Sequence, residues 1–202
     1  MSDPYSLFGL IDTSLLEMLS FALAIVMVWL NIRQSAWAWL FAITSAGLYA
    51  VVFYEAKIYG DMGLQLVFVV ISLWGWYQWL FGGKNKQGIA VSRLSSKGWG
   101  IVIVTWALAY VIIAAVLQAF TDTDVAHSDA FLTAGSLVAQ YLLTRKTIEN
   151  WHLWIILDLL YIGLYVHKNL YLTAVLYGLF ALLAFVGLFT WKKSLAAKEV
   201  MP

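Results

Sequence analysis

Hydrophobic and polar residues follow one another along this chain in long blocks, not with the short period of a surface helix or strand. Crossing a bilayer as an α-helix takes about 17 to 25 predominantly apolar residues, and seven runs meet that need. They cover residues 15–31, 36–54, 63–81, 99–120, 128–144, 150–167 and 170–191. Because backbone polar groups find no water in lipid, the pattern predicts an all-α integral membrane protein with seven transmembrane helices.

Composition supports this fold class and narrows the chemistry. Hydrophobic residues make up 63% of the 202 residues and charged residues only 11%, with a mean hydropathy of +0.83, whereas soluble domains carry about 25% charged residues. The chain has no cysteine, which excludes disulfides and cysteine-based metal or redox chemistry. A net charge of +1 gives no sign of a nucleic-acid partner. Residues 1–14 lack the basic region of a secretory signal and are a candidate for a short interfacial helix.

The distribution of lysine and arginine predicts the orientation, because cytoplasmic loops carry an excess of both. With the N-terminus placed outside, only Lys57 and Lys168 face the periplasm, and the loop "TDTDVAHSD" before residue 130 is acidic. The C-terminus is then cytoplasmic. The ten basic residues on the cytoplasmic side are Arg33, Lys84, Lys86, Arg93, Lys97, Arg145, Lys146, Lys192, Lys193 and Lys198.

A weak internal repeat relates the first three predicted helices to the last three. The matches pair Gly47, Leu48, Tyr49, Tyr59, Phe68, Gly75 and Trp79 with Gly163, Leu164, Tyr165, Tyr171, Phe180, Gly187 and Trp191. Chance is the alternative, because glycine, leucine and aromatic residues are common in membrane helices. The repeat predicts a 3+1+3 arrangement: an N-terminal segment (1–14), a three-helix bundle (15–81), a cytoplasmic loop with a linker helix (82–120), and a second bundle with a cytoplasmic tail (121–202). Parallel repeats of this kind occur in transporters, with the substrate near the midplane.

The sixth predicted helix carries polar groups on one face. At a period of 3.6 residues, Asn150, Trp154, Asp158, Tyr161 and Tyr165 align. An ionised acid at mid-membrane costs on the order of 3 kcal/mol even on the gentler insertion scales. We therefore expect this stripe to face a water-filled or ligand-filled interior. The alternative is a neutral or hydrogen-bonded Asp158 that fixes helix packing.

Other helices add polar candidates. Gln140 belongs to a stripe with Thr133, Ser136 and Thr144, whose hydroxyls are more typical of helix–helix contacts. Gln65 lies deeper in its helix than the aromatic run "WGWYQWL", part of which suits an interfacial belt. The full set of predicted substrate-binding residues is Asn150, Trp154, Asp158, Gln65, Gln118, Gln140, Thr44, Tyr49, Trp76, Tyr161 and Tyr177.

Motifs of several other functions are missing. The sequence contains no GxxxxGK[ST], HExxH or GxSxG, and its three histidines are scattered. The last apolar run has no lysine between Tyr171 and Thr190 that could hold retinal as a Schiff base. We therefore expect neither an enzyme nor a metal or cofactor. A seven-helix receptor or scaffold stays open as an alternative to a transporter.

The runs "GWYQW" (75–79) and "NWHLWIILDLLYIGLYVHKNLYLTAVLYGLF" (150–180), within a 3+1+3 order of helices, resemble the PnuC family of bacterial nicotinamide riboside transporters. The resemblance covers residues 15 to about 193. It implies a fold similar to that of the SWEET sugar transporters, a homotrimer in the inner membrane, and facilitated diffusion followed by trapping through cytoplasmic phosphorylation. Close relatives carry thiamine or riboflavin, so another vitamin, or a sugar, is the alternative substrate.

The side chains suit the implied substrate. Nicotinamide riboside has a cationic pyridinium that aromatic faces attract, a carboxamide and a ribose diol that amide side chains can bind. Trp154 and Trp76 suit the ring, the glutamines and Asn150 suit the amide and hydroxyls, and Asp158 suits the diol or the positive charge. Asp158 is the one acid placed well inside a span, and its repeat counterpart is Ala42. Ion-coupled carriers often need more than one such group, so facilitated diffusion is favoured.

Overall fold

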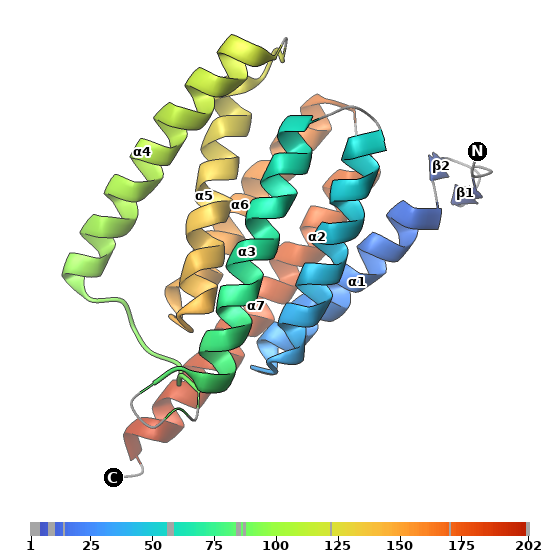
Figure 1. Cartoon of the computed structure of the whole chain (residues 1–202). Coiled ribbons are helices and arrows are strands. Elements are labelled where there is room, and N and C mark those ends of the chain that lie inside the picture. The colour runs from blue at the N-terminus through green and yellow to red at the C-terminus, as the bar shows by residue number, and fades with distance from the viewer. Residues whose placement is uncertain are drawn as a thin grey trace. The chain divides into compact units, whose positions relative to one another are not determined.

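The computed structural model describes residues 5–7, 11–13, 15–55, 59–83, 86, 88–121, 123–169 and 171–200. Seven helices make up most of this part of the chain, and Figure 1 labels them in order. Their bounds are α1 (Leu15–Ile32), α2 (Trp37–Glu55), α3 (Tyr59–Phe81), α4 (Ser96–Phe120), α5 (Ala126–Thr144), α6 (Glu149–His167) and α7 (Tyr171–Val200).

The helices follow the predicted apolar runs closely, with two differences. The third helix begins at Tyr59, four residues before the apolar run at 63, and α7 continues to Val200, past the expected end at residue 191. Among the described residues, three helical segments are long and apolar enough to cross a membrane: Met62–Phe81, Ser96–Phe120 and Thr173–Ala197. Phe21–Ile32 and Trp37–Val51 are shorter apolar helices.

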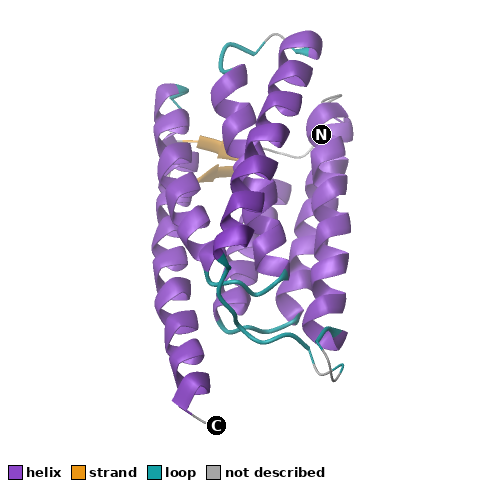
Figure 2. Cartoon of the chain, turned by 90° about the vertical axis from the view of Figure 1, so that its left-hand side faces the viewer, coloured by secondary structure: helices purple, strands orange, loops and turns teal. Residues whose placement is uncertain are grey.

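The expectation of a short helix at the N-terminus is wrong. Strand β1 (Tyr5–Leu7) pairs antiparallel with β2 (Ile11–Thr13), and Figure 2 shows the two strands in orange. The sequence gives a reason, because Pro4 and Gly9 are the two residue types with the lowest helix propensity. In this pairing Tyr5 stands opposite Thr13, Ser6 opposite Asp12 and Leu7 opposite Ile11.

The chain forms two compact units, Met1–Tyr77 and Gln78–Pro202. In the first unit α1 packs against α2, and α3 approaches α2 through a glycine. A Cβ on Gly75 would lie 2.5 Å from the ring of Trp39, which is buried. Only a residue without a side chain lets the indole lie this close to the α3 backbone, so the glycine sets the distance between the two helices.

In the second unit α4 packs on α5, α5 on α6, and α6 on α7. The core cluster lies between the first three of these helices and includes Val102, Leu132, Leu142, Leu153 and Leu157. Helix α5 can pack closely because it is rich in small buried residues, including Ala134, Gly135 and Ala139.

The contact between α6 and α7 is built from two indoles and a glycine. Trp151 and Trp191 meet edge to face with ring centroids 5.4 Å apart, and both side chains are buried. A Cβ on Gly187 would lie 2.7 Å from Trp151 ring atoms. The contact therefore has the same form as that of Trp39 with Gly75 in the first unit.

The segment that leads into α4 is held by the turn between α5 and α6. The Ser92 amide donates to the Lys146 carbonyl at 3.0 Å, and the Ile148 amide donates to the Ser92 carbonyl at 3.0 Å. The Leu94 amide donates to Glu149 Oε2 at 2.9 Å. Ser95 then caps α4 by accepting a hydrogen bond from the Gly98 amide.

Candidate functional site

The buried face of α6 carries the predicted polar stripe. Asn150 lies in the first turn and is fully buried; its Nδ2 donates to the Thr147 carbonyl at 2.6 Å. Its Oδ1 is buried and has no hydrogen-bond partner in the structure. Asp158 lies about two turns further along and is only 4% exposed, whereas Ile156 and Leu159 on the opposite face are half exposed.

No described residue donates a hydrogen bond to Asp158 or pairs with it as a cation. Among the described residues, the one ion pair joins Lys168 to Asp124. The Asp158 carboxylate interacts electrostatically with Tyr177 on α7, and both groups lie within the second unit. A buried carboxylate without a donor or a cation is costly unless a ligand or water satisfies it. Asp158 is therefore a candidate for contact with a ligand.

Three tyrosines beside Asp158 form an aromatic wall. We define the tyrosine cluster as Tyr161 and Tyr165 of α6 with Tyr177 of α7. Ring centroids are 5.8 Å apart for Tyr161 and Tyr165, 4.7 Å for Tyr161 and Tyr177, and 5.1 Å for Tyr165 and Tyr177. Phe180 extends the wall, 5.8 Å from Tyr177. The three rings therefore pack on one another and join α6 to α7.

Helix α5 adds polar groups along its buried side. Ser136 Oγ lies 3.4 Å from Tyr161 Oη, which ties the cluster to α5. Gln140, one turn further along, is also buried. Thr144 is fully buried, but its hydroxyl already donates a hydrogen bond within α5, to the Tyr141 carbonyl at 2.7 Å. Trp154 of α6 is half-buried and packs against the core cluster.

Gln118 does not join this group. It is exposed near the end of α4, and its Nε2 lies 2.9 Å from Nε2 of His127. Tyr110 Oη lies 3.0 Å from the other ring nitrogen of His127. In the sequence the histidines are scattered, and Tyr110 had no predicted role. The spacing of eight residues between Tyr110 and Gln118 puts them on the same side of α4 and could have suggested a shared partner.

In the first unit the predicted residues differ in their exposure. Thr44 is exposed, and its hydroxyl donates to the Leu40 carbonyl at 2.9 Å within its own helix. Its neighbour Ser45 is the buried hydroxyl of α2. Tyr49 of α2 and the α3 residues Gln65 and Trp76 are half-buried.

In the described part of the first unit, the buried polar residues that were not predicted as substrate-binding are Asn31, Ser45 and Ser72. Asn31 lies in the last turn of α1.

Burial or a hydrogen bond shifts the pKa of two charged groups that lie outside the helices. Lys146, in the turn between α5 and α6, is only 8% exposed, and its Nζ lies 4.4 Å above the Trp79 ring centroid. Burial lowers the pKa of Lys146 to about 8. In the loop before α5, a hydrogen bond from Lys168 lowers the pKa of Asp124. Within the described residues, no group of three histidine, aspartate or glutamate side chains could hold a metal ion.

Comparisons with known proteins agree with one another. The model of the family described as "Nicotinamide mononucleotide transporter" matches residues 14–193. The riboflavin/roseoflavin transporter RibM of Streptomyces davaonensis is 27% identical over 180 residues, which cover 87% of this chain and 83% of RibM. The nicotinamide riboside transporter PnuC of Escherichia coli is 24% identical over 179 residues, covering 76% of this chain and 75% of that protein.

One solved structure has a similar fold. The crystal structure of the vitamin B3 transporter PnuC superposes with a TM-score of 0.70 at 24% sequence identity. The superposition covers 90% of this chain and 82% of the other.

Proposed function

We propose a function from one established premise: the chain belongs to the nicotinamide mononucleotide transporter family, whose model matches residues 14–193. The resemblance found in the sequence is thereby confirmed. The protein is a multi-pass membrane transporter, and the relatives that it matches are transporters as well. Its substrate, mechanism and assembly are the subject of the proposal.

We propose that the protein takes up nicotinamide riboside by facilitated diffusion across the bacterial inner membrane. The vitamin is then trapped by phosphorylation in the cytoplasm. The N-terminus is periplasmic, the C-terminus is cytoplasmic, and the protein is a homotrimer. Thiamine and sugars are the further substrates that the sequence leaves open.

The proposal of this substrate rests on the buried Asp158 carboxylate, which has neither a cation nor a hydrogen-bond donor among the described residues. Nicotinamide riboside brings a positive pyridinium, which such a carboxylate attracts in a medium of low dielectric constant. The tyrosine cluster supplies ring faces for the same cation. Gln140 and Asn150 supply amide groups for the carboxamide and ribose, since Asn150 Oδ1 has no partner in the structure.

Riboflavin is the second candidate, favoured by the match to RibM over 87% of this chain. Riboflavin is also a planar ring joined to a hydroxylated chain, but it carries no positive charge at neutral pH. The two substrates therefore make different demands on Asp158. A cationic ring is attracted by the negative charge of Asp158, whereas a neutral ring leaves that charge buried and unpaired.

We also propose the 3+1+3 repeat, with one change in the alignment. Three observations support the repeat. Helices α2 and α6 have the same length. The number of residues between their starts equals the number that separates Trp39 from Trp151 and Gly75 from Gly187, the residues of the two tryptophan–glycine contacts. Gln34 and Lys146, which precede α2 and α6 at this spacing, both have positive φ angles of 56° and 50°. This spacing pairs Tyr49 with Tyr161 and Asp158 with Ala46, whereas the sequence comparison paired Tyr49 with Tyr165.

Flux into liposomes tests the proposed function and separates it from a receptor or scaffold. Purified protein should carry labelled nicotinamide riboside down its gradient, with saturation, and without an ion gradient. Unlabelled riboflavin should compete weakly. Absence of flux with either vitamin would contradict the transporter role, and a requirement for a proton or sodium gradient would contradict facilitated diffusion. Saturable flux of riboflavin alone would select the second candidate.

A further inference from the structure

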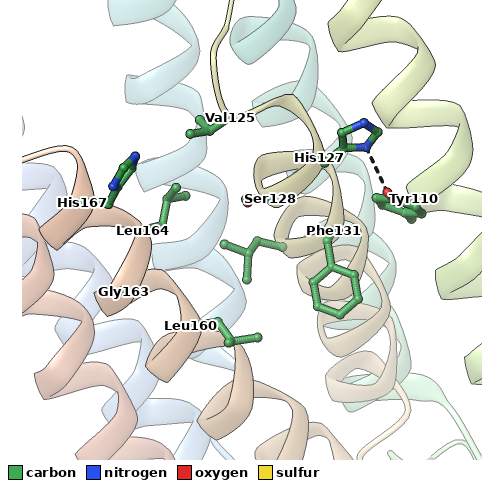
Figure 3. Close-up of a pocket in the computed structure, with 10 residues that line it drawn as sticks. Tyr110, Val125, His127, Ser128, Phe131, Leu160, Gly163, Leu164 and His167 are labelled. Carbon is green, nitrogen blue, oxygen red and sulfur yellow. Dashed lines mark hydrogen bonds between the residues drawn. The ribbon is translucent and has the colours of Figure 1, made fainter.

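A cavity of about 600 Å³ lies between α4, α5 and α6, on the opposite side of the α5–α6 core from the tyrosine cluster. Figure 3 shows α5 between the other two helices, with side chains from all three directed into the space. This volume is within the range of sites that hold a small molecule or part of a lipid, about 300 to 1,000 Å³. Helices α4 and α6 each pack on α5, and the cavity separates them.

The lining changes from polar to apolar along the helices. The polar groups lie where the helices reach the α4–α5 and α6–α7 loops: His127 and Ser128 in the first turn of α5, His167 in the last turn of α6, and Tyr110 level with His127 through their hydrogen bond. One to two turns deeper, the lining residues are Phe131, Leu132, Leu160 and Leu164. An occupant should therefore be polar at the membrane surface and apolar toward the bilayer centre.

The hydrogen bonds of His127 leave a donor available to the polar end. Gln118 Nε2 is an amide nitrogen and can only donate, so His127 Nε2 accepts and its Nδ1 carries the proton. That proton is donated to Tyr110 Oη at 3.0 Å. The Tyr110 hydroxyl proton then remains to donate to an acceptor in the cavity, such as a phosphate oxygen.

The charge at this end argues against an anionic occupant. Lys168 and Asp124 are the chain neighbours of the lining residues His167 and Val125, and Lys168 is paired with Asp124, whose side chain is 71% exposed. The paired lysine offers no net positive charge, while the exposed carboxylate can still meet an ammonium group.

We propose that the groove between α4 and α6 is a binding site for a zwitterionic phospholipid, whose phosphate accepts from Tyr110 and whose ammonium group lies near Asp124. The acyl chain fills the space along Phe131, Leu160 and Leu164. The lipid then joins α4, the linker between the two bundles, to α6. This site is separate from the substrate stripe on the other side of α6, so its failure would not affect the proposed transport function.

A glycine allows the cavity to be filled without disturbing the fold. Gly163 lines the cavity, and a Cβ added there would meet nothing within 4 Å, so the side chain of Gly163→Leu enters open space. Gly100 on α4 has equally open surroundings and does not line the cavity, which makes Gly100→Leu the matched control. Tyr110→Phe removes the hydroxyl and keeps the ring, and Asp124→Asn leaves Lys168 without its partner.

The experiment is native mass spectrometry of the delipidated full chain in detergent, titrated with dioleoyl-phosphatidylethanolamine or dioleoyl-phosphatidylglycerol. We expect the wild type and Gly100→Leu to retain the ethanolamine lipid preferentially, and Gly163→Leu to lose most of it. Tyr110→Phe should bind about fivefold more weakly, as expected for one neutral hydrogen bond. Asp124→Asn should shift the preference toward the glycerol lipid.

Several results would overturn the proposal. Equal lipid retention by Gly163→Leu and Gly100→Leu would mean that the bound lipid lies elsewhere. If the wild type and Asp124→Asn both retained the two lipids equally, the bound lipid would be part of a non-specific annulus and not the occupant of a headgroup-selective site. A change in oligomeric state in Gly163→Leu, with lipid retention unchanged, would assign the groove to a second copy of the chain. Tyr110→Phe does not fill the cavity, so it tests the headgroup contact even where Gly163→Leu fails to fold.

Discussion

Replacing Asp158 by asparagine should weaken the binding of a cationic vitamin far more than that of a neutral one. The substitution keeps the size of the side chain and a hydrogen-bonding oxygen, but it removes the charge. Asp158 is 4% exposed and has no cation partner among the described residues, so a cationic ligand would be the counter-charge that stabilises its ionised form.

The size of the effect follows from Coulomb's law. Unit charges about 5 Å apart interact with about 3 kcal/mol at an effective dielectric constant of about 20. Residual water in an open site reduces this to roughly 2 kcal/mol, which corresponds to about 30-fold in affinity. The neutral comparison ligand is the reduced dihydropyridine form of nicotinamide riboside, which keeps the ribose and carboxamide and lacks the charge. Its affinity should change less than about threefold.

The assay is equilibrium binding of both ligands to purified protein by calorimetry. Glu149→Gln is the matched control, because Glu149 is a second buried acid on α6, about 13 Å from Asp158 at a rise of 1.5 Å per residue. Its oxygen accepts from the Leu94 amide, and a glutamine oxygen can do the same. An equal loss of affinity for both ligands in Asp158→Asn would refute the charge argument and leave Asp158 with a packing or hydrogen-bonding role. Unchanged affinity for both would place the substrate elsewhere.

Three further predictions concern packing, charge and topology. Gly187→Ala should lower the unfolding free energy by about 1 to 3 kcal/mol, because its Cβ would lie 2.7 Å from the buried Trp151 ring; Gly178→Ala, where the nearest atom is 3.9 Å away, should be near neutral in a thermal-unfolding assay. Lys146 has a pKa lowered to about 8, so the unfolded chain holds its proton more tightly and this group makes stability rise between about pH 8 and 10.5; Lys146→Met should lose that slope, and an unchanged slope would mean that another group causes it. The chain has no cysteine, so Lys193→Cys offers a single thiol, which a membrane-impermeant maleimide should label in inverted vesicles and not in intact cells; the opposite pattern would reverse the proposed orientation.

The helices were predictable because a bilayer requires long apolar runs, and the structure places seven helices along the seven runs. The ends were less accurate. The apolar pattern stops near residue 191, yet α7 continues to Val200 through "KKSLAAKEV", since lysine, alanine and glutamate favour a helix in water as well. The hairpin was missed because strands of three residues carry almost no periodic signal.

Part of the candidate site was also within reach of the sequence. A period of 3.6 residues was enough to align Asn150 with Asp158, and both are buried on α6. The three-dimensional partners were out of reach, since nothing in the spacing of α5 and α7 indicates that Ser136 and Tyr177 meet Tyr161. Gln118 was selected as a substrate-binding amide, but α4 ends at Phe120, which leaves Gln118 two residues from the loop, where its amide lies 2.9 Å from a ring nitrogen of His127.

The alignment of the proposed repeat distinguishes the residues that pack the helices of each bundle from the residues that bind the substrate. The tryptophan–glycine contact occurs in both units, with Trp39 on Gly75 and Trp151 on Gly187. At the same spacing, the α2 counterparts of Asn150 and Asp158 are Ala38 and Ala46, and both are buried. A polar residue needed for packing should recur in both bundles, as the indoles and glycines do. Because the amide and the acid occur only on α6, we infer that they are present for the substrate, and that the second unit contributes most of the affinity.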